Sequence, residues 1–229
     1  SRHPTLHPQS TSMTVKTVKN AKGNVQAPTT RNICWANRDV PFNNFLVLFW
    51  HGWPSQWYPS KFQDENGLEF NCCEQYMMYH KARLFGDAEI MEQVMATSCP
   101  KTQKGLGRMV SNFNPQVWDQ ACDKVVTSGN LLKFQQNREL QDLLLATGDR
   151  IIAEASKFDK IWGIGLAPDD YLAWDPKCWK GTNRLGKALM QVRSEVQGGR
   201  SEVQGVAAGV MLPVSIDHTV ITTISISDS

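Results

Sequence analysis

The strongest constraint on the fold is a series of helix-length segments in the second part of the chain. In each of them apolar residues recur at intervals of three and four, the spacing of an amphipathic helix. These segments cover about residues 73–86, 87–97, 115–135, 137–146 and 182–195. Only two short apolar runs before them, Phe45–Trp50 and Leu68–Phe70, are typical of buried strands, and an Asp64-Glu-Asn-Gly turn precedes the second. We therefore expect a mainly α fold, a single compact helical domain with a minor β component.

Length and composition indicate the domain boundaries. A chain of 229 residues can bury one sizeable core. Residues 1–43 are rich in Thr, Ser, Pro, Asn and Lys without periodicity, and we expect a flexible N-terminal arm there. Residues 44–196 form the expected domain. A short duplication, Arg193-Ser-Glu-Val-Gln-Gly and Arg200-Ser-Glu-Val-Gln-Gly, leads into residues 197–229, which we expect to be a C-terminal tail without a catalytic role.

Charge and cysteine content exclude several classes of protein. The formal net charge of +2 does not by itself indicate a nucleic-acid-binding surface. The six cysteines include no C-x-x-C motif and have no histidines at zinc-finger spacing, so we expect no metal site. No apolar run approaches the roughly 18 to 20 residues that a membrane span needs. We expect a cytoplasmic or nuclear protein with reduced thiols, and no membrane partner.

Two charged residues lie on the apolar face of the segment that starts at Cys73. At about 100° per residue, Lys81 falls about 20° from Glu74 around the helix. The same face carries Met77, Met78, Ala82, Leu84 and Phe85, and the other face carries Tyr76, Tyr79 and Arg83. Burying either charge alone is costly, so the two form a structural ion pair or a site at a cavity wall, unless the lysine simply extends to solvent. A desolvated lysine can act as a nucleophile, whereas a nearby carboxylate raises its pKa again.

A basic segment follows in Pro100-Lys-Thr-Gln-Lys-Gly-Leu-Gly-Arg. Lys104 and Arg108 are four residues apart with two glycines between them, which suits the close approach of a phosphate. The spacing of a Walker loop is absent, and a solvent-exposed basic helix end has the same pattern.

Two later loops also offer binding groups. Asp159 precedes Trp162 by three residues, so this loop could bond ribose hydroxyls and stack a base, although a core tryptophan behind a turn has the same sequence. Thr182 or Asn183 has the character of a helix cap whose neighbouring backbone amides could bind an anion, and capping alone would also explain the asparagine.

Taken together, the order and spacing of these motifs resemble those of the NADAR (YbiA-like) family over about residues 45–196. The matching motifs are Trp57-Tyr58-Pro, Glu74 with Lys81-Ala, Phe85-Gly-Asp, Lys104-x-Leu-Gly-Arg108, Trp118, Lys133-Phe134, Leu144-Leu-x-Thr-Gly, Asp159-x-x-Trp162-Gly163-x-Gly, and Gly181-x-Asn183-x-Leu-Gly186 with Leu189-Met-x-Val-Arg193. Gln56 departs from the pattern, because the family often has Asn before the aromatic residue.

The resemblance implies an N-glycosidase that acts on ribose without a metal or cofactor. It implies that Lys81 attacks the anomeric carbon and forms a Schiff base, that Glu74 transfers protons, and that Asp159 orients the ribose or Lys81. The substrate-binding residues that it implies are Trp57, Tyr58, Lys104, Arg108, Trp162, Gly163, Asn183 and Gly186.

The family resemblance leaves three functions open. The first is release of ADP-ribose from ADP-ribosylated guanine, either in nucleic acid or in a nucleotide. The second is cleavage of phosphorylated ribosylamino-pyrimidine intermediates of riboflavin synthesis. The third is binding of ADP-ribose or NAD without chemistry. We take the first as the expected function, with an ADP-ribose-bearing guanine nucleotide or nucleic acid as partner.

Overall fold

The computed structural model describes residues 40–206, so nearly all of the expected arm and the tail beyond Val206 lie outside the described residues. The described part contains six α-helices, four short strands and two 3₁₀ segments, which confirms the mainly α fold with a minor β component. The helices are α1 (Cys73–Leu84), α2 (Ala88–Ala96), α3 (Pro100–Gly107), α4 (Pro115–Gln136), α5 (Arg138–Ala146) and α6 (Arg184–Val206). The strands are β1 (Leu46–Phe49), β2 (Phe62–Gln63), β3 (Glu69–Phe70) and β4 (Ile151–Glu154), and the 3₁₀ segments are η1 (Tyr171–Trp174) and η2 (Pro176–Cys178).

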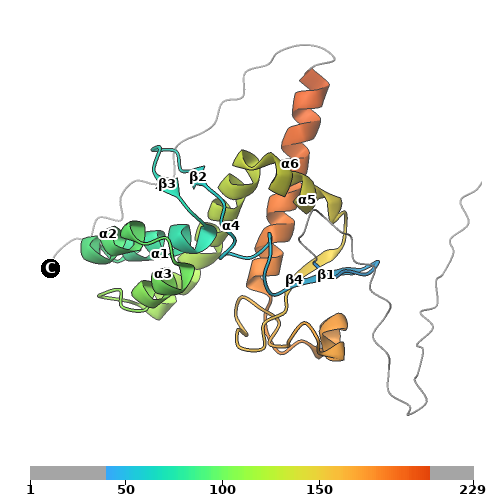
Figure 1. Cartoon of the computed structure of the whole chain (residues 1–229), viewed down its shortest axis with the longest axis horizontal. Coiled ribbons are helices and arrows are strands. Elements are labelled where there is room, and N and C mark those ends of the chain that lie inside the picture. The colour runs from blue at the N-terminus through green and yellow to red at the C-terminus, as the bar shows by residue number, and fades with distance from the viewer. Residues whose placement is uncertain (1–39, 207–229) are drawn as a thin grey trace, which may run out of the picture.

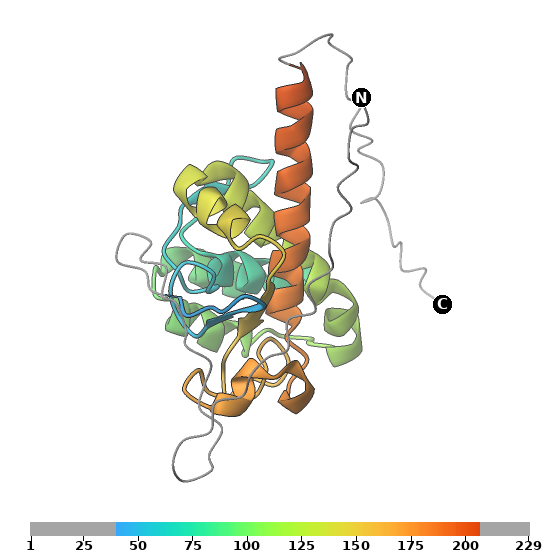
Figure 2. The ribbon, with the colours of Figure 1, turned by 90° about the vertical axis from the view of Figure 1, so that its right-hand side faces the viewer.

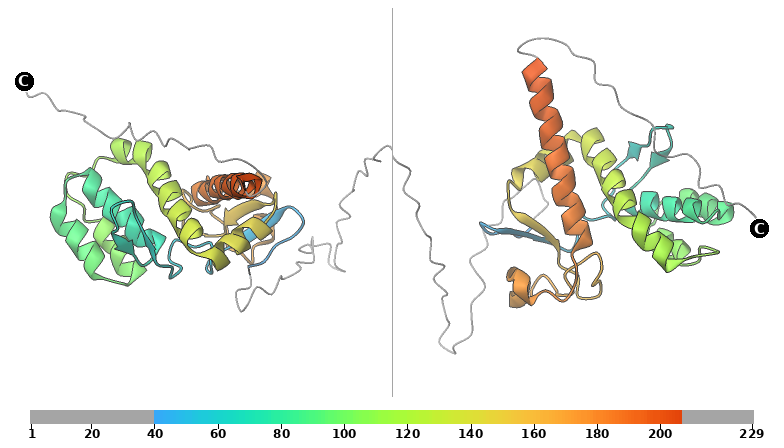
Figure 3. Two further views of the ribbon diagram at one scale, coloured as in Figure 1. Left: turned by 90° about the horizontal axis from the view of Figure 1, so that it is seen from above. Right: turned by 180° about the vertical axis from the view of Figure 1, so that it is seen from behind.

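Helix α4 runs between two groups of elements (Figures 1 and 3). On one side lie α1, α2, α3 and the β2–β3 hairpin; on the other lie α5, α6 and the β1–β4 pair. α4 contacts both α1 and α6. Helix α6 extends well beyond the rest of the described chain (Figure 2). Parts of the chain that are distant in sequence therefore meet along α4.

Strands β1 and β4 form a parallel pair. Leu46 pairs with Ile151 and Phe49 pairs with Glu154, and all four residues of β1 are buried. β1 was expected from its apolar run, whereas β4 was not, because Ile-Ile-Ala-Glu is short and has no alternating pattern. α1 to α5 lie between the two strands in the chain, as the crossover of a parallel pair requires. The pairing brings Glu154 to the end of a buried strand.

Helix α1 is covered on more than one side. Tyr76, expected on the outer face, is buried against Phe62 and Phe70 of the β2–β3 hairpin, with ring centroids 5.9 and 4.9 Å away. Leu84, expected on the apolar face, is exposed at the end of the helix. Both expectations were wrong: Tyr76 is buried because α2, α3, α4 and β3 all contact α1, so a single apolar stripe does not describe the helix, and Leu84 is its last residue.

Helix α3 was not expected as a separate helix. Its sequence contains two glycines, which weaken a helical pattern. Pro100 occupies its first turn, where a proline is well tolerated. Gly107 at its end lies close to α1, since a Cβ added there would be 2.0 Å from Met78 Sδ. This contact brings the basic end of α3 against α1.

Helix α6 starts in direct contact with β4 and runs to Val206, beyond the expected end of the domain at residue 196. A Cβ added at Gly186 would lie 2.1 Å from the Ile152 carbonyl oxygen, closer than real atoms approach. Gly198, further along the same helix, has open space around it. A glycine inside a helix costs only about 1 kcal/mol, and this cost is too small to end α6 at Gly198. A substitution at Gly186 therefore tests close packing against β4, whereas one at Gly198 tests helix propensity alone.

Replacing Gly186 with alanine should destabilise the fold, because the new methyl group has no room against β4. We expect Gly186→Ala to lower the free energy of unfolding by about 1–3 kcal/mol, measured by chemical denaturation. The matched Gly198→Ala variant should raise it by up to about 1 kcal/mol. Equal stabilisation of both variants would contradict the close approach of α6 to β4.

Candidate active site

The aromatic loop of residues 53–58 is held by a buried lysine on α4. Lys133 is 0% exposed, and its ammonium donates hydrogen bonds to the carbonyl oxygens of Trp53, at 2.8 Å, and Ser55, at 3.1 Å. It also lies 5.6 Å from the ring centroid of Tyr58, which is half-buried. Burial lowers the pKa of Lys133. The lysine thus fixes the path of the loop.

The same loop binds the first turn of α1. The Gln56 carbonyl oxygen accepts a hydrogen bond from the Glu74 backbone at 3.0 Å, and the Gln56 side chain accepts one from Asn130 at 2.8 Å. The Trp57 side chain hydrogen-bonds to the Glu74 carboxyl group, while 38% of Trp57 remains exposed. An indole can only donate, so Trp57 stabilises the ionised form of Glu74.

Glu74 is a buried carboxyl group among charges of both signs. It is 5% exposed, and burial raises its pKa to about 7. The positive charge of Lys104 is the largest effect in the opposite direction; Arg108 acts the same way, while Asp159 raises the pKa further. Glu74 can therefore both hold and release a proton near neutral pH.

Glu154 is a second such carboxyl group, and the sequence did not suggest it. Burial raises its pKa to about 7, Asp159 and Glu74 raise it further, and Lys104 opposes them. Its Oε2 atom is fully covered and has no hydrogen-bond partner among residues 40–206. The only signal in the sequence is a carboxylate that directly follows the apolar Ile-Ile-Ala run. The fold thus joins Glu74 from α1 and Glu154 from β4.

Asp159 closes the loop that follows β4. One of its carboxylate oxygens accepts hydrogen bonds from the backbone of Ile161, at 2.9 Å, and Trp162, at 2.8 Å. Gly163 fits tightly behind it, since an added Cβ would lie 2.9 Å from the carbonyl oxygens of both Asp159 and Glu154. Gly163 therefore serves close packing of the loop against the end of β4.

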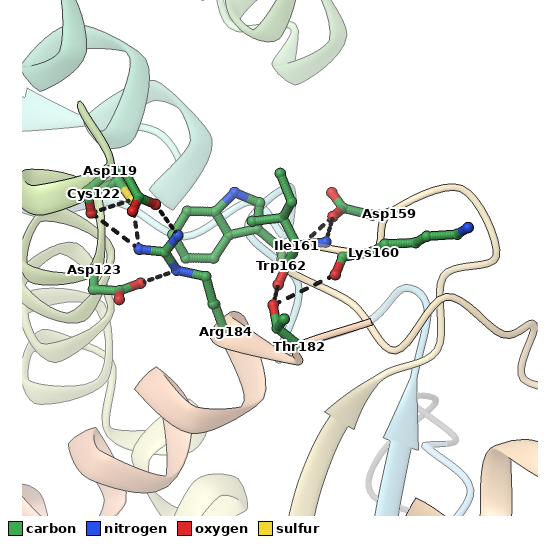
Figure 4. A network of polar contacts seen from close by, with 9 residues as sticks. All are labelled: Asp119, Cys122, Asp123, Asp159, Lys160, Ile161, Trp162, Thr182 and Arg184. Carbon is green, nitrogen blue, oxygen red and sulfur yellow. Dashed lines mark hydrogen bonds and ion pairs between the residues drawn. The ribbon is translucent and has the colours of Figure 1, made fainter. Parts of the chain in front are cut away.

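The ring of Trp162 lies next to Arg184, which is part of a network of polar contacts (Figure 4). The Arg184 guanidinium lies 5.4 Å from the Trp162 ring and bonds to two carboxylates of α4, those of Asp119 and Asp123. Thr182 donates a hydrogen bond to the Ile161 carbonyl at 2.6 Å. These contacts tie the Asp159 loop to α4 and to the start of α6.

Lys81 lies on the same side of the molecule as the basic end of α3 but does not pair with Glu74. Its ammonium donates a 2.6 Å hydrogen bond to the Gly107 carbonyl and lies 4.0 Å from the centroid of the Phe113 ring. Burial lowers its pKa, and the charge of Arg108 lowers it further. Glu74 and Lys81 are seven positions apart, which corresponds to about 10 Å along the helix axis, so sharing a face does not bring them into contact.

Asn183 and Gly186 connect α6 to β4. Asn183 is 2% exposed and has left-handed backbone geometry with a φ of 52°. Its side chain donates to the Ile152 carbonyl at 2.9 Å and accepts from the Glu154 backbone at 3.1 Å. Both polar ends of the side chain are thus used within the protein, so Asn183 holds the backbone of Glu154 in position.

The expected site residues, apart from Tyr58 beside Lys133, form a central group, two residues at its edge and a group behind β4. Lys104, Arg108, Asp159 and Trp57 all act on the carboxyl of Glu74, and Lys104 and Asp159 also act on the unexpected Glu154. Lys81 adjoins Arg108, and Trp162 adjoins the Asp159 loop. Gly163, Asn183 and Gly186 pack behind β4. In the part of the chain that the structure describes, no group of His, Cys, Asp and Glu side chains could hold a metal ion, and no helix is long and apolar enough to span a membrane.

Fold and site together define a small, mainly α domain with buried carboxyls and a cationic flank, an arrangement suited to acid–base chemistry. The chain belongs to the NADAR domain family, whose model matches residues 48–197.

Individual relatives agree with this assignment. The chain is 47% identical over 147 residues to an N-glycosidase of Acanthamoeba polyphaga mimivirus, covering 62% of this chain and 86% of the relative. It is 40% identical over 157 residues to Protein irg-1 of Caenorhabditis elegans, covering 62% and 74%. The NMR structure of the Escherichia coli protein YbiA matches with a TM-score of 0.58 and 25% identity, over 70% of this chain and 90% of YbiA.

The raised pKa of Glu74 makes stability depend on pH. A carboxyl whose pKa is raised in the folded state stabilises the fold fully below the unfolded pKa, near 4.5, and loses this contribution as pH rises through about 7. We expect the free energy of unfolding to fall between pH 5 and 8, and to fall less in Glu74→Gln, by on the order of 1–3 kcal/mol. Denaturation at the two pH values measures the difference. Glu92→Gln, an exposed control on α2, should follow the parent; a parallel fall in Glu74→Gln would contradict the burial of Glu74.

Proposed function

We propose that this chain is an N-glycosidase that hydrolyses the ribose–nitrogen bond of ADP-ribosylated guanine and releases ADP-ribose. The observation that carries the proposal is the convergence of two carboxyls of pKa about 7 with the cationic end of α3. Membership of the NADAR domain family and a relative named N-glycosidase at 47% identity support the coarser part, cleavage of an N-glycosidic bond.

The cations fit the charged part of this substrate. ADP-ribose carries a diphosphate, and Lys104 and Arg108 supply positive charge within reach of Glu74. Trp57 is partly exposed and Trp162 half-buried, and both present indole surface on which a purine can stack. The proposed substrate thus matches the site in charge and in aromatic surface.

Lys81 is the proposed nucleophile, because burial and Arg108 lower its pKa and so favour the neutral amine. Its Nζ atom forms a bond to the anomeric carbon while the bond from that carbon to the guanine nitrogen breaks. The departing nitrogen takes the bonding electrons and a proton from a carboxylic acid of the site.

The sugar ring then opens. The ring oxygen takes one of the protons of the now positively charged Nζ as its bond to the anomeric carbon breaks, which gives a protonated Schiff base on Lys81. Water adds to this carbon and loses a proton to Glu74, and the bond to Nζ breaks. The products are ADP-ribose, the free base and the regenerated amine, so the balance is hydrolysis.

The proposal predicts that Lys81→Ala retains ADP-ribose binding and loses nearly all release of ADP-ribose from a guanine-ADP-ribosylated oligonucleotide, measured by mass spectrometry. Cyanoborohydride should trap a covalent adduct on Lys81 in the parent. The exposed control Lys177→Ala should behave as the parent.

Other outcomes would identify a different function. Retained turnover by Lys81→Ala would reject Lys81 as nucleophile. Release of a pyrimidine from the phosphorylated riboflavin intermediate, with none from the oligonucleotide, would favour that substrate. Tight ADP-ribose binding with no turnover on either substrate would indicate a binding module.

A further inference from the structure

Glu154 is held in place by its backbone while one carboxyl oxygen stays unpaired. Its N–H donates to Asn183 at 3.1 Å, and its carbonyl oxygen accepts from Ile164 at 2.9 Å. The Oε2 atom is covered without a hydrogen-bond partner among the described residues. Glu154 as a residue is half-buried. A carboxyl oxygen that is covered and unpaired costs more free energy in the anion than in the neutral acid. The environment of Glu154 therefore favours its protonated form.

Glu154 and Glu74 differ in the groups that stabilise their anions. Glu74 receives a hydrogen bond from Trp57 and faces two cations, Lys104 and Arg108. Of these groups only Lys104 lowers the pKa of Glu154, while Asp159 from the loop and Glu74 from α1 oppose its ionisation. When the pair holds one proton, it therefore resides mainly on Glu154.

We propose that Glu154 is a catalytic residue that donates the proton to the departing nitrogen, while Glu74 is its ionised partner and the base of the reaction. This division of roles rests on the N-glycosidase activity of the proposed function and does not depend on which base departs. It adds to the site a residue that the family resemblance did not suggest for the reaction.

The proposed step balances. As the bond between the anomeric carbon and nitrogen breaks, its electron pair moves to the nitrogen, which takes the proton of Glu154. Glu154 is then an anion beside Asp159 and Glu74, an unfavourable state. The water that later adds to the anomeric carbon gives a proton to Glu74, and transfer of this proton to Glu154 restores the starting state.

Steady-state kinetics test the role. Glu154→Gln keeps the size of the side chain but cannot donate an acidic proton, so kcat should fall by about 10²–10⁴-fold with little change in KM. The parent should lose activity as pH rises above about 7, and this limb should be missing in the variant. Glu92→Gln should retain parental kinetics. A parental kcat in Glu154→Gln would overturn the proposal.

A change of leaving group separates proton donation from a structural role. A pyridinium riboside, NAD for example, expels a neutral base that needs no proton. On any such substrate that the parent cleaves, Glu154→Gln should therefore match the parent. An equal loss on both kinds of substrate would show that Glu154 only maintains the site.

Infrared spectroscopy tests the location of the proton without any substrate. At pH 6 the parent should show a protonated carboxyl band that disappears by pH 8.5. The band left in Glu74→Gln, which comes from Glu154, should persist to higher pH than the band left in Glu154→Gln, which comes from Glu74; the reverse order, or no band in the parent, would overturn the proposal. Because no turnover is needed, this result stands apart from a failure of the guanine substrate.

Discussion

The site depends on one buried ammonium group. An isolated charge in a protein interior is unfavourable unless hydrogen bonds replace its hydration. Lys133 meets this condition by donating to the carbonyls of Trp53 and Ser55, which forces the loop between them to approach α4. The loop then supplies the Gln56 carbonyl and the Trp57 indole to Glu74. The position of the carboxyl thus follows from a charge on a different helix.

A balance between desolvation and charge governs the chemistry of the pair. Burial alone would keep both carboxyls protonated, and Lys104 and Arg108 alone would keep Glu74 ionised. Burial is opposed by Lys104 and Arg108 at Glu74 and by Lys104 at Glu154, and the pKa of each carboxyl is about 7, where proton transfer in both directions is accessible. The short helix α3 contributes to the site through this electrostatic effect, and Gly107 at its end allows it to lie close to α1.

Much of the fold could be predicted from local periodicity, since α1, α2, α4 and α5 closely follow the expected segments. Strand β4 could not, because four residues carry little pattern and their pairing with β1 is set by distant sequence. Glu154 escaped prediction for the same reason, as its partner Glu74 lies eighty positions earlier. Asn183 shows the opposite case: its sequence context fits an anion-binding loop, whereas its side chain bonds entirely to β4.

The origin of the two carboxyls has a consequence for biosynthesis. Glu74 lies on α1 and Glu154 on β4, and the strand pairing that brings β4 into the fold requires a crossover through five helices. Until β4 has left the ribosome during synthesis, Glu74 on α1 has no Glu154 beside it. On the proposed roles of Glu74 and Glu154, the nascent chain therefore completes its site only after β4 has paired with β1.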